Sequence, residues 1–410
     1  MARIDLKKKQ EQRCLTELLC HSLNQIPMDE ATYEKLLTDT AQDEVFACAQ
    51  AHAVAPLLCA CWCASQLCEP QIRSKLENVT VQMAEHSYRL LFYTKYLVSI
   101  LEEAGFFVAV LKGVATAEYY PQPELRKAAD IDLLLFSPEN CRCAADFLKT
   151  KGFLEETEVV HQHHIVLHAA EGIEVELHSM FAEPFENETV NEVMLRLQER
   201  ARANVQRCAC MGVPLPVLTG AYHGLSLLLH LLQHFLTSGF GIKLLCDWVV
   251  FWNRQTIETA EEMAALIQEL GVDQFVAVVT ALCVQKLGMN PVIAQPFLAR
   301  AKEDVMEPAY LEQFFADIIE AEEFGKSEKG RMVALTEKGL WGYVKTFHHQ
   351  MHLNFPRAGK CVLAWPWLWI CTLVRFLHNN RTLRHTSARE IFKSAAARGK
   401  IAEKLHLFER

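Results

Sequence analysis

Two aspartates one residue apart, Asp130 and Asp132, open an apolar run that continues as Leu-Leu-Leu-Phe. Side chains separated by one residue point to the same face of a β-strand, so we expect the two carboxylates to lie side by side. Two like charges about 4 Å apart repel by roughly 4 kcal/mol at an effective dielectric constant of about 20. A cation usually offsets such a pair, so the first candidate ligand is a metal ion. The other interpretation is that one aspartate caps a turn and the other faces water.

A third carboxylate, Glu176, lies on a later apolar segment that can form a neighbouring strand. Glu174 shares a face of that strand and is the rival for the same role. Three carboxylates on adjacent strands can hold two divalent cations about 3.5–4 Å apart. Mg²⁺ prefers oxygen ligands and shares them with substrate phosphates, and Mn²⁺ is the second choice. One ion would lower the pKa of an attacking hydroxyl, while the other would hold a triphosphate and its leaving pyrophosphate. We therefore predict that Asp130, Asp132 and Glu176 are metal ligands and catalytic residues.

Cationic and glycine residues precede the aspartates at a spacing that suits phosphate binding. Lys112 and Gly113 end one predicted strand and open a short helix, where backbone N–H groups can face an anion. Lys112 adds a point charge for phosphate. Arg126, four residues before Asp130, could reach the same phosphates. We predict nucleotide contacts from Lys112, Gly113 and Arg126, and the alternative for both cations is structural pairing.

Several histidines have less specific patterns. His178 follows Glu176 on the same strand face, where it could orient the site or form a hydrogen bond within the core. The tract HQHHIVLH, residues 161–168, would divide its histidines between the two faces of a hairpin, so we do not expect a separate metal site there. His230 and His234 are one helical turn apart and are expected to lie in the core or line a pocket, and Asp247 could pair with one of them.

The elements expected to position these residues form an α/β unit of about 80 residues between two helical regions. Strands are predicted at 106–111, 131–136, 153–168 and 173–181. A helix is predicted from Ser137, its capping residue, to about Lys151. Helices are also expected over 11–104 and from 188 onward.

The segments around these residues resemble those of a known family. The pattern LKG, twelve residues, RxxxDIDLLL and then VELH is similar to a bacterial nucleotidyltransferase family within the DNA polymerase β-like superfamily. Further similar segments are AHAVAPLL (51–58), FLKTKGF (147–153), LHLLQHF (229–235) and KLLCDW (243–248). The superfamily usually has Gly-Gly or Gly-Ser where this chain has Lys112-Gly113, and the spacing to Asp130 is longer here.

The resemblance implies an α+β fold, with a small mixed β-sheet core flanked by helical regions. It implies metal-dependent transfer of a nucleoside monophosphate from an NTP, such as ATP, with Asp130, Asp132 and Glu176 as the carboxylates. The expected organisation is an N-terminal helical region (1–104), the nucleotidyltransferase-like core (105–187), a helical domain (188–290) and a C-terminal helical region (291–410). The acceptor would be a hydroxyl or phosphate of a small molecule, peptide or protein. The alternative is a catalytically inactive nucleotide sensor or partner-binding protein on the same fold.

Composition narrows the expected partners and location. The net charge of −9 does not suggest an avid nucleic-acid binder, and we expect no nucleic acid partner. The charged N-terminus does not resemble a secretory signal, and 15 cysteines in apolar surroundings are typical of reduced thiols, so a cytoplasmic location is expected. The Trp-rich run 361–374 is too short to span a membrane. It could lie on a membrane surface, but we expect a core helix of the C-terminal region.

Overall fold

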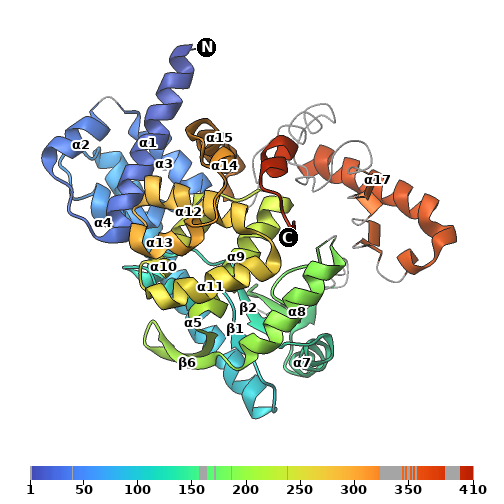
Figure 1. The fold of residues 1–410 in the computed structure, drawn as a ribbon. Coiled ribbons are helices and arrows are strands. Elements are labelled where there is room, and N and C mark those ends of the chain that lie inside the picture. The colour runs from blue at the N-terminus through green and yellow to red at the C-terminus, as the bar shows by residue number, and fades with distance from the viewer. Residues whose placement is uncertain are drawn as a thin grey trace.

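The computed structural model describes most of the chain. The residues it leaves undescribed are 1, 39, 157–163, 170–171, 186, 238, 324–343, 346, 349–350, 353, 356–357, 384–397 and 410. Figure 1 shows N-terminal helices on one side, a sheet with its covering helices below, and a C-terminal helix set to the other side. This arrangement confirms the predicted α+β fold.

The N-terminal region is helical, as its apolar periodicity predicts. Its elements are α1 (Ala2–Asn24), α2 (Glu30–Leu37), α3 (Gln42–Ala51), η1 (Ala55–Leu58), α4 (Cys59–Trp62) and α5 (Pro70–Glu103). The Asp29 side chain caps α2 by accepting a hydrogen bond from the Thr32 backbone N–H. Pro56 lies in η1 between two short α-helices, as its helix-breaking ring predicts.

Helix α5 links two hydrophobic cores formed by described residues. Its 34 residues would span about 51 Å at 1.5 Å per residue. Ile72 and Leu76 near its start pack in the core of the helical region. Leu90, Leu97 and Leu101 near its end pack in the core beneath the sheet. The helix therefore fixes the position of the sheet relative to the N-terminal helices.

Among the described residues, seven strands form a mixed sheet at the centre of the α/β unit, in the order β3-β4-β5-β2-β1-β7-β6. The strands are β1 (Ala109–Val110), β2 (Asp130–Leu134), β3 (Leu154–Glu155), β4 (His164–His168), β5 (Glu174–His178), β6 (Val205–Cys210) and β7 (Val213–Leu218). The pairs β2–β5 and β1–β7 are parallel, and the other neighbouring pairs are antiparallel. The hairpin β6–β7 extends the sheet into the stretch after residue 188, where only helix was expected.

The two faces of the sheet have different characters because strand side chains alternate. Ile131 and Leu133 of β2 are buried in one core together with Val175 and Leu177 of β5. This face packs against α7 (Pro138–Thr150). Ser137 caps the start of α7, because its side chain accepts a hydrogen bond from the Asn140 N–H. The opposite face carries the polar residues of both strands.

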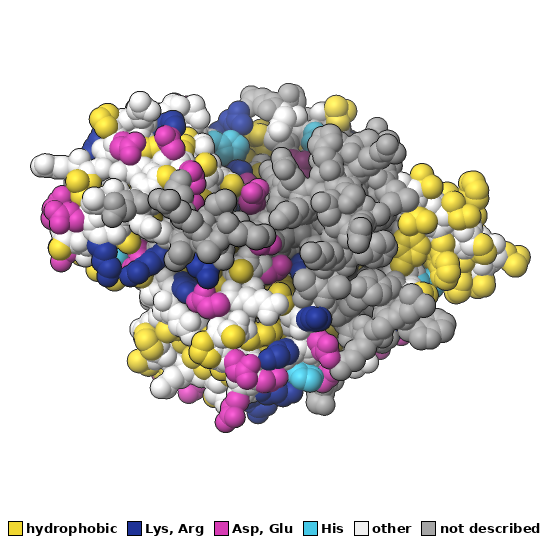
Figure 2. All heavy atoms as spheres, turned by 90° about the horizontal axis from the view of Figure 1, so that it is seen from above, with side chains coloured by type: hydrophobic (Ala, Val, Ile, Leu, Met, Phe, Trp, Pro, Cys, Tyr) yellow, Lys and Arg dark blue, Asp and Glu magenta, His cyan; other side chains and the backbone are white. Residues whose placement is uncertain are grey.

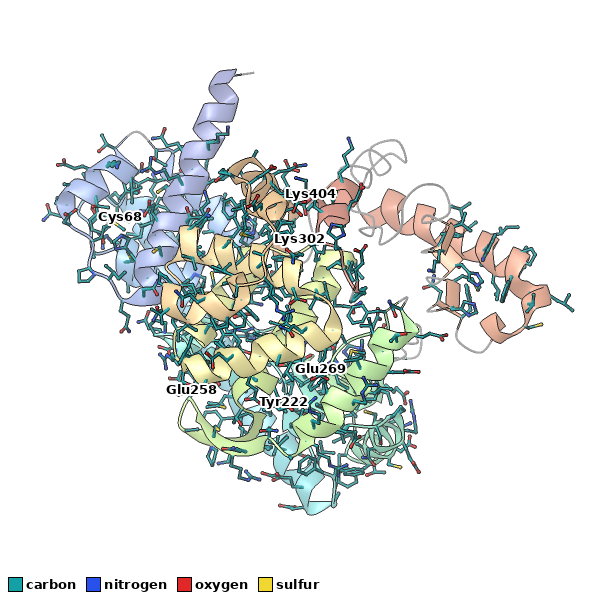
Figure 3. All side chains as sticks on the ribbon, viewed as in Figure 1. Cys68, Tyr222, Glu258, Glu269, Lys302 and Lys404 are labelled. Carbon is teal, nitrogen blue, oxygen red and sulfur yellow. The ribbon has the colours of Figure 1, made fainter. Side chains whose placement is uncertain are left out.

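Short elements and a second set of helices complete the site region. After β1 come α6 (Val114–Ala117) and η2 (Pro123–Leu125). The later helices are α8 (Glu188–Arg202), α9 (Gly220–Leu236), α10 (Ile242–Trp252), α11 (Ile257–Leu270), α12 (Asp273–Leu287), α13 (Pro291–Leu298), α14 (Glu303–Met306) and α15 (Pro308–Ala321). Figure 3 shows Glu269 of α11 close to Tyr222 of α9, where these two helices pack together.

The Trp-rich segment forms η4 (Ala358–Lys360), η5 (Val362–Ala364) and α17 (Trp365–Leu383). In Figure 1, α17 lies at the edge of the molecule, away from the sheet. Several of its large apolar side chains are exposed, including Trp367 and Ile370. The prediction of a core helix is therefore wrong for this face. Among the helices that the structure describes, none combines the length and apolarity needed to cross a membrane.

Candidate functional site

The strand register brings the predicted carboxylates together. In the parallel pair β2–β5, Asp132 lies opposite Glu176, and Asp130 lies opposite Glu174. Neighbouring strands are about 4.8 Å apart, so the side chains of opposed residues lie within reach of one another. Asp132 is only 2% exposed, whereas Glu176 and Asp130 are less deeply buried. The four carboxylates share one face of the sheet.

His178 connects two of these carboxylates. Its Nε2 atom lies 2.9 Å from Asp132 Oδ1 and 2.9 Å from Glu176 Oε2. Burial lowers the pKa of His178, but its hydrogen bonds with both carboxylates outweigh that effect, and the net shift is upward. His164, opposite His178 on β4, places its Nε2 3.8 Å from Glu176 Oε1. The His178 ring therefore fixes the orientation of both carboxylates.

Lys112 lies directly on this cluster. Its Nζ atom is 2.7 Å from Asp132 Oδ1 and 3.5 Å from Nδ1 of His230. Burial raises the pKa of Asp132, but the Lys112 ammonium and the His178 ring more than offset this, so the pKa is lowered. For Lys112, burial lowers the pKa, and the surrounding carboxylates, Asp132 foremost, raise it above its ordinary value. Both groups are therefore charged at neutral pH.

Asp130 shows that the carboxylates crowd one another. Its pKa is raised to about 6, first by the neighbouring Asp132 charge and then by burial. Carboxylate oxygens of Asp130, Glu174 and Glu176 all lie within 4.8 Å of one another. A second group, formed by His164, Glu176 and His178, meets the same limit. A crowded set of oxygen ligands with one strongly raised pKa fits a divalent cation such as Mg²⁺ or Mn²⁺.

The turn before α6 requires glycine. Gly113 has φ +54° and ψ −117°, and the Ala115 N–H donates to the Lys112 carbonyl at 3.0 Å. These values define a type II′ turn, whose first central residue is nearly always glycine because a side chain is disfavoured at this φ. The turn places Lys112 at the end of β1, beside the carboxylates on β2.

We expect Gly113→Ala to destabilise the fold by about 1–2 kcal/mol, because alanine must adopt a positive φ. Urea denaturation measures the difference in the free energy of unfolding. Gly399→Ala is the control, because Gly399 has an ordinary φ, lies in a helix, and has open space where a Cβ would be. Equal stability of the two variants would contradict the requirement for glycine at residue 113.

Arg126 is held by a buried acid from another part of the chain. Its Nε and Nη2 atoms donate to the two carboxylate oxygens of Asp247 on α10, at 2.7 and 2.8 Å. Its Nη1 atom donates to the Gly113 carbonyl at 3.2 Å, and the Tyr120 hydroxyl donates to Asp247 at 2.7 Å. Arg126 was predicted to bind phosphate, but most of its N–H donors are thus bonded to acceptors within the protein. Arg126 ties the Gly113 turn to α10.

A cavity of about 450 Å³ opens over the carboxylate face. Its floor includes Lys112, Gly113, Asp130, Asp132, Glu176 and His178. Helix α9 and the start of α10 contribute His230, Gln233, His234 and Lys243 to its wall. The volume lies within the range of about 300–1,000 Å³ typical of small-molecule sites.

The titratable residues in the wall of this cavity have lowered pKa values. Burial, followed by the Lys112 charge, lowers the pKa of His234 to about 3 and that of His230 well below its ordinary value. Burial, followed by the charge of Arg126, lowers the pKa of Lys243 to about 8. At neutral pH the wall therefore presents neutral imidazoles and a largely protonated amine.

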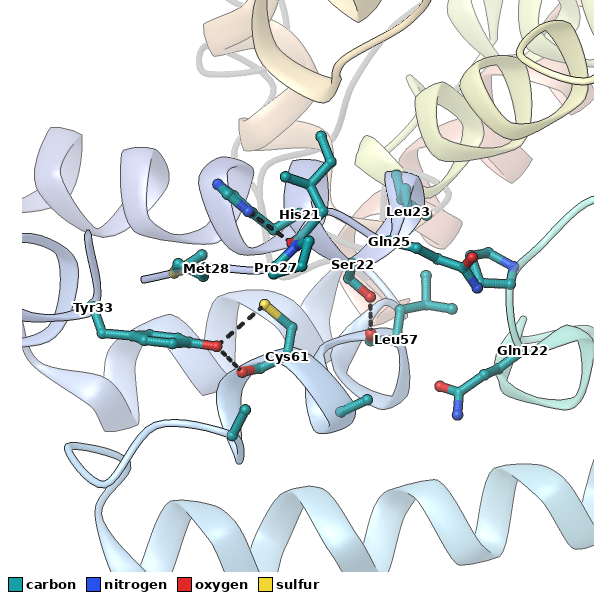
Figure 4. A pocket seen from close by; sticks show the side chains of 14 residues that line it. His21, Ser22, Leu23, Gln25, Pro27, Met28, Tyr33, Leu57, Cys61 and Gln122 are labelled. Atoms are coloured by element: carbon teal, nitrogen blue, oxygen red, sulfur yellow. Dashed lines mark hydrogen bonds between the residues drawn. The ribbon is translucent and has the colours of Figure 1, made fainter. Parts of the chain in front are cut away.

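A second cavity of about 430 Å³ lies among the N-terminal helices (Figure 4). Tyr33, Cys61 and Leu57 face it from the helical side, and Gln122 reaches it from the loop before β2. The described residues that line it include no Asp, Glu, Lys or Arg. This cavity lacks the charged groups that a metal-bound triphosphate requires.

The structure groups most of the predicted residues, and it adds others. Lys112, Gly113, Arg126 and His178 all line the same cavity as the metal-ligand candidates. His164 was not singled out, although it belongs to the tract 161–168, whose residues 161–163 lie outside the described part. Lys243 was also missed, and its place at the start of KLLCDW was the available signal. Asp247 pairs with Arg126 and Tyr120 instead of with a histidine of α9.

Comparison with known proteins gives one match. The sequence model of a family described as uncharacterised nucleotidyltransferase matches residues 38–288, more than half of the chain. No curated protein and no solved structure matches the chain. The matched stretch contains all the residues that line the cavity over the carboxylates.

Proposed function

The chain belongs to the uncharacterised nucleotidyltransferase family, and on this premise we propose that it transfers a nucleoside monophosphate from an NTP to an acceptor, with the help of divalent cations. The acceptor is a hydroxyl or phosphate of a small molecule, peptide or protein. Family membership supports nucleotidyl transfer in general. The proposal that the transfer requires a metal ion is based on the residues that line the cavity.

One observation carries the proposal: carboxylates of two adjacent parallel strands converge in a cavity large enough for a small molecule. Asp130, Asp132 and Glu176 would hold Mg²⁺ or Mn²⁺. When bound, the ions would lower the pKa of the acceptor hydroxyl and neutralise charge on the triphosphate. The raised pKa of Asp130 supports this role, because it reports repulsion that a cation would relieve.

The other residues of the site bind and position. The Lys112 ammonium supplies positive charge for the triphosphate, and the Gly113 turn lets the backbone approach it closely. His178 holds the Asp132 and Glu176 carboxylates in fixed orientations through one ring nitrogen. Arg126 is proposed as a positioning residue, since it connects the turn to Asp247. The neutral His230 and His234 line the cavity, where they would contact the nucleoside or the acceptor.

Glu176 is proposed as the third metal ligand in preference to Glu174. Glu176 lines the cavity and shares His178 with Asp132, whereas Glu174 is not among the residues that line the cavity. We expect Glu176→Gln to lower the transfer rate by at least about 100-fold and Glu174→Gln to lower it only a few-fold. Steady-state rates of pyrophosphate release measure both variants. An equal or larger loss in Glu174→Gln would reverse the assignment.

The direct experiment incubates the protein with each NTP and Mg²⁺ or Mn²⁺, and measures pyrophosphate and self-labelling. Pyrophosphate release that stops when EDTA is added is the expected result. Calorimetry of NTP binding distinguishes a transferase from a catalytically inactive nucleotide sensor. Tight, Mg²⁺-dependent binding of NTP would indicate a sensor and contradict the transferase if no acceptor extract gives pyrophosphate release.

A further inference from the structure

Helix α17 has an inner face that is already packed. The Trp365 indole N–H donates to the Gly359 carbonyl at 2.7 Å, and the Trp369 indole N–H donates to His348 Nδ1 at 3.1 Å. Leu368 and Thr372, on the same side of the helix, are buried. These contacts hold one face of α17 against the segment before it. They also fix which side chains remain on the other face.

The outer face of α17 and η5 is apolar and exposed. The side chains of Leu363, Trp367, Ile370 and Val374 are 93%, 67%, 53% and 59% exposed. Trp367, Ile370 and Val374 follow helical spacing, so they form one stripe. Figure 2 shows hydrophobic side chains gathered over the part of the molecule that projects to the right, where α17 lies in Figure 1. An apolar patch of this kind marks an interaction surface.

The sequence around this face has a charge that contrasts with the rest of the chain. Residues 338–389 contain eight Lys or Arg and no Asp or Glu, although the chain as a whole carries a net charge of −9. A basic segment is attracted to anionic lipid headgroups, and the attraction weakens as salt screens it. Exposed tryptophan favours the boundary between headgroups and acyl chains because its ring is apolar and its N–H is polar.

We propose that the outer face of η5 and α17 binds the surface of an anionic lipid membrane, with the helix parallel to the membrane plane. The length of the apolar run is too short for a span, and an exposed apolar stripe within a basic segment is the pattern of an interfacial helix. In a symmetric dimer formed through this face, the basic segments of the two copies would lie together and repel one another, so the charge favours anionic lipid over a second copy of this chain. The enzyme would thus act on an acceptor at, or delivered from, a membrane surface.

The test is co-sedimentation of the full-length protein with vesicles of phosphatidylcholine alone or mixed with phosphatidylglycerol. We expect binding to the mixed vesicles, weaker binding at high salt, and little binding to phosphatidylcholine alone. The triple variant Trp367→Ser, Ile370→Ser and Val374→Ser should reduce binding about tenfold or more while keeping the wild-type thermal melting curve, because these side chains are exposed.

The control variant Val81→Ser with Phe92→Ser removes exposed apolar side chains from α5 and should bind vesicles like the wild type. Absence of wild-type binding to anionic vesicles at low salt would overturn the proposal, as would equal binding by the triple variant. Self-association without lipid, lost in the triple variant, would assign the face to a second copy of the chain and would also overturn it. None of these outcomes depends on nucleotidyl transfer, so failure of either proposal is distinguishable from failure of the other.

Discussion

Asp132→Asn is expected to lower the rate of nucleotidyl transfer by at least about a thousandfold, because loss of even an outer partner of a metal ligand typically costs about 10–100-fold. Asparagine keeps the shape of the side chain and one oxygen acceptor, but it removes the charge that a divalent cation needs. The same change takes away the anionic partner of Lys112, which lies 2.7 Å from Asp132 Oδ1. Pyrophosphate release under saturating Mg²⁺ and NTP measures the effect.

Asp130→Asn is the companion variant, because it removes a carboxylate charge without disturbing the pair between Lys112 and Asp132. Its folded state should be at least as stable as the wild type, since Asp130 is the carboxylate whose pKa is raised to about 6 by its neighbours. We expect the same loss of transfer in a protein that melts normally. Full activity in either variant would remove the paired aspartates from the catalytic site.

Asp247→Ala is expected to destabilise the fold by about 3–5 kcal/mol, the usual cost of leaving one partner of a buried ion pair uncompensated. Burial raises the pKa of Asp247, but Arg126 more than offsets this, so the pKa is lowered and the carboxylate is charged in the folded state. The substitution leaves the buried Arg126 guanidinium and the Tyr120 hydroxyl without this acceptor. Urea denaturation measures the change in the free energy of unfolding.

An exposed ion pair provides the matched control. Arg200 and Glu269 lie 2.9 Å apart, similar to the buried pair, but both side chains are more than a third exposed. Exposed pairs contribute about 0–1 kcal/mol, so Glu269→Ala should change stability little. If Asp247→Ala and Glu269→Ala lower stability by the same small amount, the Arg126–Asp247 pair does not hold the Gly113 turn against α10.

The sequence predicted the site best where alternation along a strand determines which side chains share a face. Asp130 and Asp132 had to share a face once β2 formed, and an apolar run ending in Phe136 made that strand predictable. The same alternation placed Glu176 and His178 on one face of β5. These two residues lie close to Asp132 only because β2 and β5 are neighbouring strands. The order of the strands along the chain is compatible with this pairing but does not dictate it.

Contacts between distant parts of the chain could not be derived in this way. Arg126 and Asp247 are 121 residues apart, and only the folded structure, in which Arg126 donates to Asp247, shows that they pair. The strand β7 was missed because Pro214 and Pro216 argue against a strand with neighbours on both sides, although β7 pairs with β1 and with β6. The Trp-rich run 361–374 has the apolar composition of a core helix. Its exposure depends on which other elements pack against it, and the sequence of the run does not show this.

Transfer of label from NTPs labelled at the α- or the γ-phosphate tests the central claim most directly. With Mg²⁺ or Mn²⁺ and a small-molecule and protein extract as the source of acceptors, the product should carry the α label and never the γ label. The γ label should leave as pyrophosphate, and EDTA and Asp132→Asn should each stop both events. Transfer of the γ label, or α-label transfer that persists in Asp132→Asn, would contradict nucleotidyl transfer at these carboxylates.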